Sequence, residues 1–245
     1  MHRYKISIEY KGTNYVGWQR QDNGLSIQES LENAIKQLTA EKADVFGAGR
    51  TDAGVHALNQ VAHFDLKKSM ELDSIRDGLN QYLRPQPIAI IKANEVSDNF
   101  HARFSAKQRI YKYIIFNRVS VPSIYKNRGW HIRKKLDLKL MKKGTQKLLG
   151  TNDYSTFRAS SCNAKNPVRT IKSIRIKKIK DRIEIQFKSQ SFLQQQVRSM
   201  VGCLKYLAEN KWNLKKFEKA FKSKKRTLCA TPAPAHGLFL EKVIY

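Results

Sequence analysis

The sequence lacks two features that mark large classes of proteins. No stretch approaches the roughly 18 consecutive apolar residues that span a bilayer, and the first residues lead into strand-like sequence without a signal-peptide core. Cysteine is scarce, since Cys162, Cys203 and Cys229 are odd in number, far apart and outside any C-x-x-C spacing. That spacing argues against a disulfide framework and a zinc site. We therefore expect a protein of the reducing cytoplasm with no membrane association.

Motifs for metal and nucleotide chemistry are also missing. The histidines form no H-E-x-x-H motif and no cluster with cysteine, so no metal-ligand set can be read from the sequence. The phosphate-binding pattern G-x-x-x-x-G-K-[ST] does not occur either. We therefore expect an activity that needs no metal, nucleotide or redox cofactor.

Acidic residues are scarce in only one half of the chain. Residues 1–100 carry a net charge of −1, whereas residues 101–245 carry +28, and the whole chain has a net charge of +27 and a pI of about 10.1. Such a charge repels itself in a compact fold unless a polyanion neutralises it. A solvated lysine-rich face is the alternative. The asymmetry predicts that the polyanion contact lies mainly on residues 101–245.

Residues 1–100 show one clear order of elements. Tyr4, Ile6, Ile8 and Tyr10 alternate with polar residues, which is the two-residue period of a half-buried strand. A capping box at 26–29 predicts the start of a helix. The further elements expected are strands at 44–49 and 60–65, a helix over 72–83 and an apolar strand at 88–91. This order is β-α-β-β-α-β.

Residues 101–245 repeat that order with one extra helix. The expected elements are a strand at 107–116, a helix from the N-cap Asp137 to Gly150, a hairpin of 168–178 with 182–188, an amphipathic helix over 193–207, a shorter helix over 214–221 and a closing strand at 237–245. We therefore predict an α+β fold of two ferredoxin-like or RNA-recognition-like halves. Each would have an antiparallel sheet with helices on one face.

The segment 46–57 gathers small residues around one carboxylate and one guanidinium. Arg50 and Asp52 lie two positions apart, and the surrounding glycines and alanines let a ligand approach the backbone closely. A dinucleotide-binding loop does not fit, because G-x-G-x-x-G would need glycine where Asp52 stands and a helix directly afterwards. An Asp-capped turn remains the structural alternative.

The run Gly49-Arg50-Thr51-Asp52-Ala53-Gly54-Val55-His56 resembles the signature loop of the tRNA pseudouridine synthase A family. The resemblance continues in order through Gly17-Trp18-Gln19-Arg20-Gln21, Gln60-Val61-Ala62-His63-Phe64, Phe100-His101-Ala102-Arg103-Phe104-Ser105-Ala106, Arg109-Ile110-Tyr111-Lys112-Tyr113, Phe192-Leu193, Val197-Arg198, Val201-Gly202 and Gly237-Leu238-Phe239-Leu240. It implies that Asp52 is the essential catalytic residue, acting as the nucleophile or as the group that starts glycosidic cleavage.

Two residues of the second half receive roles from the same resemblance. Periodicity makes Tyr111 co-facial with Tyr113 and leaves it open between a core tyrosine and a ligand contact; the resemblance implies that it packs against the target base. Arg198 could be a surface arginine that contacts phosphate; the resemblance implies that it pairs with Asp52, which places the active-site cleft between the halves. Either Arg50 or Arg198 as partner would favour the ionised form of Asp52.

The function implied by the resemblance is an isomerase that converts uridine to pseudouridine at positions 38, 39 and 40 of the tRNA anticodon stem-loop. The partners implied are tRNA and a second copy of the chain in a homodimer, and the basic half would carry most RNA contacts. The alternative is a non-catalytic double RNA-recognition module, in which cations and aromatics serve binding alone. That alternative lacks the usual aromatic signature of such modules and leaves Arg50 and Asp52 unexplained.

Overall fold

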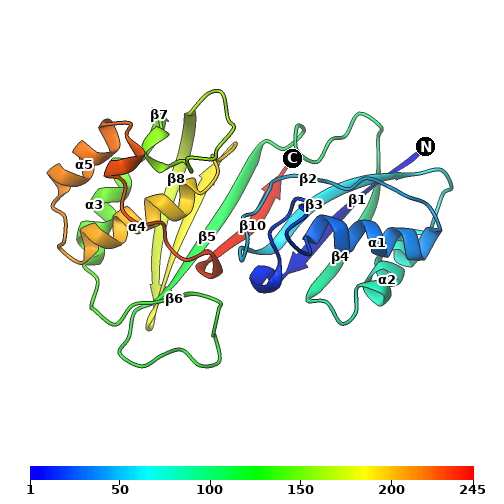
Figure 1. The fold of residues 1–245 in the computed structure, drawn as a ribbon, viewed down its shortest axis with the longest axis horizontal. Helices are drawn as coiled ribbons and strands as arrows, with labels where there is room; N and C mark the ends of the chain where they lie inside the picture. The colour runs from blue at the N-terminus through cyan, green and yellow to red at the C-terminus, as the bar shows by residue number, and fades with distance from the viewer. The chain divides into compact units, whose positions relative to one another are not determined.

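A computed structural model describes residues 1–245, which form ten strands and five α helices (Figure 1). The α+β class expected from the sequence is therefore confirmed. Backbone contacts divide the chain into two units: unit 1 is Met1–Lys107 with Phe239–Tyr245, and unit 2 is Gln108–Leu238. The last seven residues of the chain thus group with its first 107.

Unit 1 has the predicted order β-α-β-β-α-β before β10. Its elements are β1 (His2–Tyr10), α1 (Ile27–Thr39), β2 (Phe46–Gly47), β3 (His56–Leu66), α2 (Leu72–Leu83) and β4 (Ile88–Val96). The capping residue Ser26 accepts a hydrogen bond from the Glu29 N–H at 3.1 Å, as the capping box predicts. β2 is shorter than expected and β3 is longer.

The sheet of unit 1 is antiparallel except at one edge. β1 lies between β4 and β3, and β2 pairs antiparallel with β3 at His63. β10 (Leu238–Ile244) pairs with the same strand in parallel, at His56 and Ala57. The expectation of purely antiparallel sheets is thus wrong here. Since the two-residue β2 covers only part of the β3 edge, the backbone of His56 and Ala57 is left for β10.

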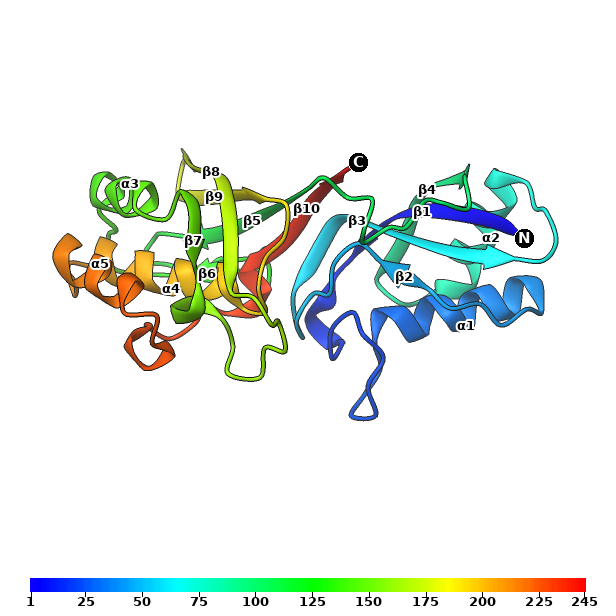
Figure 2. The same ribbon diagram turned by 90° about the horizontal axis from the view of Figure 1, so that it is seen from above.

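The core of unit 1 lies on one face of its sheet. Tyr4, Ile6 and Ile8 are fully buried, while the residues between them are partly exposed, as their alternation predicts. α1 and α2 pack side by side (Figure 2), so closely that a Cβ added to Gly78 would lie 2.5 Å from Leu38. Burial of these apolar faces holds β3 in the sheet. Since β2 pairs with β3, both ends of the loop between these two strands are held as well.

Unit 2 contains two short strands that the sequence did not predict. Its elements are β5 (Gln108–Phe116), β6 (Trp130–His131), α3 (Leu138–Gln146), β7 (Gly150–Asp153), β8 (Val168–Ile179), β9 (Arg182–Ser189), α4 (Gln196–Ala208) and α5 (Leu214–Lys222). α3 begins after its predicted cap Asp137, but it ends before Gly150, which starts β7. Strands as short as β6 and β7 contain too few residues to show a period.

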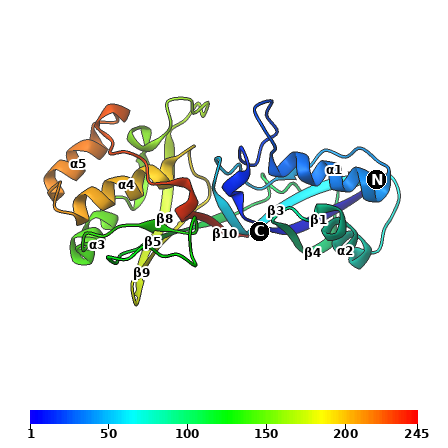
Figure 3. The ribbon, with the colours of Figure 1, turned by 60° about the horizontal axis from the view of Figure 1, so that its bottom comes forward.

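The sheet of unit 2 has the order β5-β9-β8-β7 with antiparallel neighbours, and β6 adds to β5 in parallel. The predicted hairpin is β8 and β9, in yellow-green and yellow in Figure 3. α3, α4 and α5 pack against one another. The buried core of this unit includes Phe187 of β9, Leu204 of α4 and Phe217 of α5. None of the five helices combines the length and apolar character that a membrane crossing requires.

Candidate active site

The loop that carries Asp52 is held along its backbone by the segment before α1. Gly17 and Asp52 form an antiparallel bridge, and the Trp18 N–H donates to the Thr51 carbonyl at 3.0 Å. Within the loop, the Val55 N–H donates to the Asp52 carbonyl at 3.1 Å, which closes a turn. The Asp52 side chain is half-buried in this frame, whereas Arg50 is exposed.

Two glycines allow this close contact. A Cβ on Gly12 would lie 2.0 Å from the Val55 carbonyl oxygen, and a Cβ on Gly17 would lie 2.7 Å from that of Thr51. Gly17 also has a φ of +116°, a conformation that residues with a side chain rarely adopt. Gly17 and Trp18 in turn accept from the Ile27 and Gln28 N–H groups. The loop is therefore tied to the first turn of α1.

Buried side chains support the loop from the sheet. The Tyr10 and Thr51 hydroxyls lie 2.8 Å apart, and Gln60 donates from Nε2 to the Gly49 carbonyl at 2.7 Å. His56, the first residue of β3, accepts the Gly12 N–H on Nδ1 at 2.9 Å. Neither Tyr10 nor Gln60 has a role that the sequence predicts; the one signal for Gln60 is its place in the segment Gln60–Phe64, which resembles the family.

Tyr111 lies on the buried face of β5, in unit 2. It is 8% exposed and pairs across the ladder with Phe187 of β9. Its ring meets that of Phe192 edge to face, with centroids 5.2 Å apart and an interplanar angle of 86°. Tyr113 and Ile115 are buried on the same face, so the predicted co-facial arrangement is confirmed. Phe192 is a neighbour that periodicity alone could not supply.

Arg198 lies in the first turn of α4 and is half-buried. Its Nε donates to the Ala233 carbonyl at 2.9 Å, and the Ala233 N–H donates to the Arg198 carbonyl at the same distance. The next carbonyl, of Pro234, accepts the Tyr113 hydroxyl at 2.8 Å. Burial raises the pKa of that tyrosine, and the Arg198 charge opposes the rise. The backbone at 233–234 therefore orients both side chains.

The predicted residues thus lie in two groups. Arg50 and Asp52 are on one loop of unit 1, and Tyr111 and Arg198 are on β5 and α4 of unit 2. No group of three or more His, Cys, Asp and Glu side chains is arranged to hold a metal ion.

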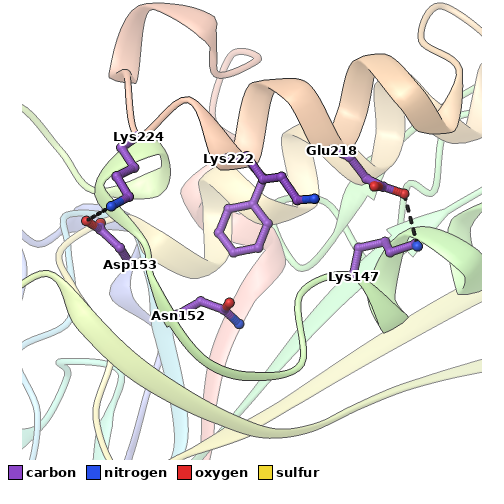
Figure 4. A pocket seen from close by; sticks show the side chains of 7 residues that line it. Lys147, Asn152, Asp153, Glu218, Lys222 and Lys224 are labelled. Atoms are coloured by element: carbon purple, nitrogen blue, oxygen red, sulfur yellow. Dashed lines mark ion pairs between the residues drawn. The ribbon is translucent and has the colours of Figure 1, made fainter.

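A pocket of about 290 Å³ lies elsewhere in unit 2 (Figure 4). Its lining residues are Lys147, Asn152, Asp153, Glu218, Phe221, Lys222 and Lys224. Asp153 pairs with Lys224 at 3.6 Å and Glu218 with Lys147 at 3.0 Å, so both carboxylates are already neutralised. None of the predicted site residues lines this pocket.

The charge asymmetry follows the division into units. Unit 2 contains 32 Lys and Arg against 6 Asp and Glu, whereas unit 1 contains 15 against 14. On β8, Lys172, Arg175 and Lys177 are exposed. An excess of cations this large on one unit is suited to neutralising several phosphates of a polyanion.

Comparison with known proteins gives consistent matches. Residues 6–105 and 145–245 match the family model described as "tRNA pseudouridine synthase". The chain is 64% identical over 246 residues to tRNA pseudouridine synthase A of Pelagibacter ubique and 46% identical over 245 residues to that of Parvibaculum lavamentivorans. In both cases the alignment covers 100% of each chain.

A likeness to a solved structure is much weaker. The structure described as "Crystal Structure of a Cbf5-Nop10-Gar1 Complex" aligns with 82% of this chain and 44% of its own, at 13% identity and a TM-score of 0.37. A score this low carries no argument about the fold.

Proposed function

Because this chain belongs to the tRNA pseudouridine synthase A family, we propose that it isomerises uridines 38, 39 and 40 of the tRNA anticodon stem-loop, with Asp52 as the catalytic residue. The predictions of the family, of isomerase activity and of tRNA as the substrate are confirmed by this membership. The alternative of a non-catalytic RNA-recognition module is thereby set aside. The observation that supports the residue assignment is the fixed loop of Asp52, which is hydrogen-bonded at Gly49, Thr51 and Asp52.

The chemistry exchanges one bond of uridine for another. The bond between N1 of uracil and C1′ of ribose breaks, the base turns, and a bond forms between C5 and C1′; C5 loses its hydrogen as a proton and N1 takes up a proton. The Asp52 carboxylate acts as the nucleophile or starts glycosidic cleavage, and its charged form is the one required. A guanidinium nearby favours that form, which gives Arg50 or Arg198 a role in the reaction.

Tyr111 and Arg198 complete this proposal. Tyr111 would offer its aromatic face to the flipped base, as aromatic side chains commonly do with unstacked bases. Arg198 would pair with Asp52, which requires the cleft between the halves that the family resemblance implies. The support for Arg198 is that its Nε is already fixed to Ala233, so its guanidinium has a defined direction.

The activity test is tritium release from tRNA labelled at C5 of uridine. Asp52→Asn should abolish release while tRNA affinity stays the same, because one carboxylate contributes the chemistry and many cations contribute the binding. Asp44→Asn, an exposed carboxylate before the same loop, should release tritium at the wild-type rate. Release by Asp52→Asn near the wild-type rate would refute the catalytic assignment.

The target positions and the docking mode are proposals of the same kind. Cations of unit 2 contact phosphates and therefore read tRNA shape more than sequence, so many tRNAs should be substrates and an isolated anticodon stem-loop a poor one. Carbodiimide derivatisation with primer extension should find pseudouridine at 38–40 in full-length tRNA at matched salt. Modification confined to the T-loop would refute the positions, and efficient modification of the bare stem-loop would refute the docking mode.

The state of the protein in the cell completes the proposal. We propose a cytoplasmic homodimer in which one tRNA contacts both subunits, a proposal supported only by the family resemblance. Sedimentation equilibrium of the purified chain tests the dimer, and a mass equal to one chain across the working concentration range would refute it.

A further inference from the structure

Two of the three cysteines lie together in unit 2. Cys203 is in the middle of α4 and 1% exposed, and Cys229 follows a short 3₁₀ helix, Arg226–Leu228, and is half-buried. Their sulfur atoms are 3.6 Å apart although the residues are 26 positions apart in the sequence. Both are free thiols, as is Cys162 on the loop before β8. A small movement would therefore bring the two sulfurs to bonding distance.

The surroundings make the two sulfurs chemically unequal. Arg226 lies beside Cys229 and donates to the Ser199 hydroxyl at 2.9 Å, so a cation faces this sulfur. A hydrogen bond from Cys203 and the Arg226 charge lower the pKa of Cys229, against the opposing effect of burial. The same hydrogen bond and burial raise the pKa of Cys203. Thiolate character and exposure favour oxidation, so Cys229 is the thiol that reacts first.

The sulfur of Cys203 is held in position beside Cys229. The Ala230 N–H donates to the Cys203 sulfur at 3.3 Å, which holds the chain after Cys229 against α4. A reactive thiol next to a resolving thiol is the arrangement found in redox-sensitive proteins. Cys203 has no role in the proposed isomerisation of uridine.

We propose that Cys203 and Cys229 are a redox-sensitive pair that forms a reversible disulfide with peroxide and thereby slows the enzyme. The Cys229 thiolate attacks one peroxide oxygen, the O–O bond breaks, and a sulfenic acid forms as water leaves. The Cys203 sulfur then attacks the sulfenic sulfur and expels the second water. In sum, two thiols are oxidised to a disulfide and one peroxide is reduced to two waters; a dithiol reverses the reaction.

The disulfide would change the position of Arg198. A disulfide has an S–S separation of about 2 Å, whereas the two sulfurs are 3.6 Å apart, so we expect 229–233 to shift relative to α4. That segment carries Ala233, which bonds Arg198 through both its N–H and its carbonyl. Displacement of a catalytic group by about 1 Å can cost roughly a hundredfold in rate, so we expect the oxidised enzyme to lose about tenfold or more in turnover. This effect on rate rests on the proposed function, whereas disulfide formation does not.

The first measurement is chemical and uses the full chain. Peroxide should lower the thiols that titrate in the denatured wild type from three to one, and peptide mass spectrometry should find Cys203 linked to Cys229. Cys162→Ser is the matched control and should form the same link. Cys229→Ser should form none, and Cys203→Ser should stop at a sulfenic acid that dimedone traps. Cys203→Ala repeats this last test should a buried serine weaken α4.

The second measurement is tritium release from labelled tRNA before and after oxidation. Wild type and Cys162→Ser should lose turnover and regain it with dithiothreitol, whereas Cys229→Ser should keep its rate in peroxide. Three titrating thiols after oxidation, or a link to Cys162, would overturn the pair. An oxidised enzyme with full turnover would overturn the effect on rate. A reduced enzyme that releases no tritium would instead refute the proposed function, with the linked peptides still observable.

Discussion

The hydroxyl groups of Tyr10 and Thr51 meet at 2.8 Å inside unit 1 and join the end of β1 to the residue before Asp52. Both residues are buried, with exposed fractions of 2% and 6%. A hydrogen bond between buried groups is costly to leave unmade, so it constrains the direction in which the loop leaves the sheet. The position of the Asp52 carboxylate therefore depends on a strand residue more than forty positions earlier.

Tyr10→Phe should impair the reaction more than the fold. The substitution removes the hydroxyl but keeps the ring, whose centroid lies 6.2 Å from that of Trp18. We expect a loss of about 1–2 kcal/mol in the free energy of unfolding, measured in urea, and a clear fall in tritium release. Tyr15→Phe is the control, because it also loses a hydrogen bond, but one to Gln86, at 3.2 Å, and not to a residue of the loop. Equal turnover in the two variants would contradict the role of Tyr10.

Gly17→Ala should displace the loop that carries Asp52. The new methyl group would lie 2.7 Å from the Thr51 carbonyl oxygen at a φ of +116°, and such backbone strain costs on the order of 1–3 kcal/mol. We expect both thermal stability and turnover to fall. Gly24→Ala is the matched control, since its φ is +151° but its methyl group would meet only the Val16 side chain. If Gly24→Ala lost as much activity, strain rather than displacement of Asp52 would be the cause.

Arg198→Lys should lower turnover by roughly a hundredfold, the usual effect of losing one preorganised donor in an active site. The guanidinium of Arg198 donates to the Ala233 carbonyl through Nε and leaves its terminal nitrogens to point elsewhere. A lysine has a single nitrogen and cannot do both, so the fixed geometry is lost. Arg175→Lys, on the exposed side of β8, controls for the change of cation. Should Arg198→Lys keep wild-type kinetics, the residue is a phosphate contact and no more.

Tyr111 can be tested for an aromatic role separately from packing. Tyr111→Phe keeps the edge-to-face contact with Phe192 and should keep tRNA affinity and most of the turnover. Tyr111→Leu fills much of the same space without an aromatic face, so it should retain the fold by circular dichroism and lose turnover. A core tyrosine that never contacts the base would give the same turnover in both variants.

Acid should weaken unit 1 through His63. Burial, with His101 and Arg3 nearby, lowers the pKa of this histidine to about 4, and its Nδ1 accepts the Ala102 N–H at 3.2 Å. The unfolded chain takes up this proton near pH 6.5, whereas the folded chain takes it up only near pH 4. The free energy of unfolding therefore keeps its full value above pH 6.5 and falls between about pH 6.5 and 4, by at most roughly 3 kcal/mol. Urea unfolding at pH 7.5 and 4.5 measures the loss. His63→Gln should reduce the difference between the two pH values, and His131→Gln, in unit 2, should not.

The sequence could predict what repeats locally along the chain. The alternation in β1 and the cap at Ser26 each depend on a few adjacent residues, and both are observed. β6 and β7 were missed because two and four residues show no period. Within the candidate site, the resemblance predicts a catalytic role for Asp52, whereas Tyr10 and Gln60 support its loop through contacts between residues that are distant in the sequence. The proximity of Cys203 to Cys229 had no local signal for the same reason.

The parallel pairing of β10 with β3 can form only late in synthesis, because β10 lies near the C-terminus. The edge of β3 at His56 and Ala57 receives its neighbour only when Leu238–Ile244 exists, and residues 67–237 must be translated first. At about 5–20 residues per second this takes roughly ten to thirty seconds on the ribosome. During that time, the strand that begins four residues after Asp52 has an unpaired edge, which is a template for pairing with another chain. A nascent chain of residues 1–107 should therefore be a better client for chaperones than the finished enzyme.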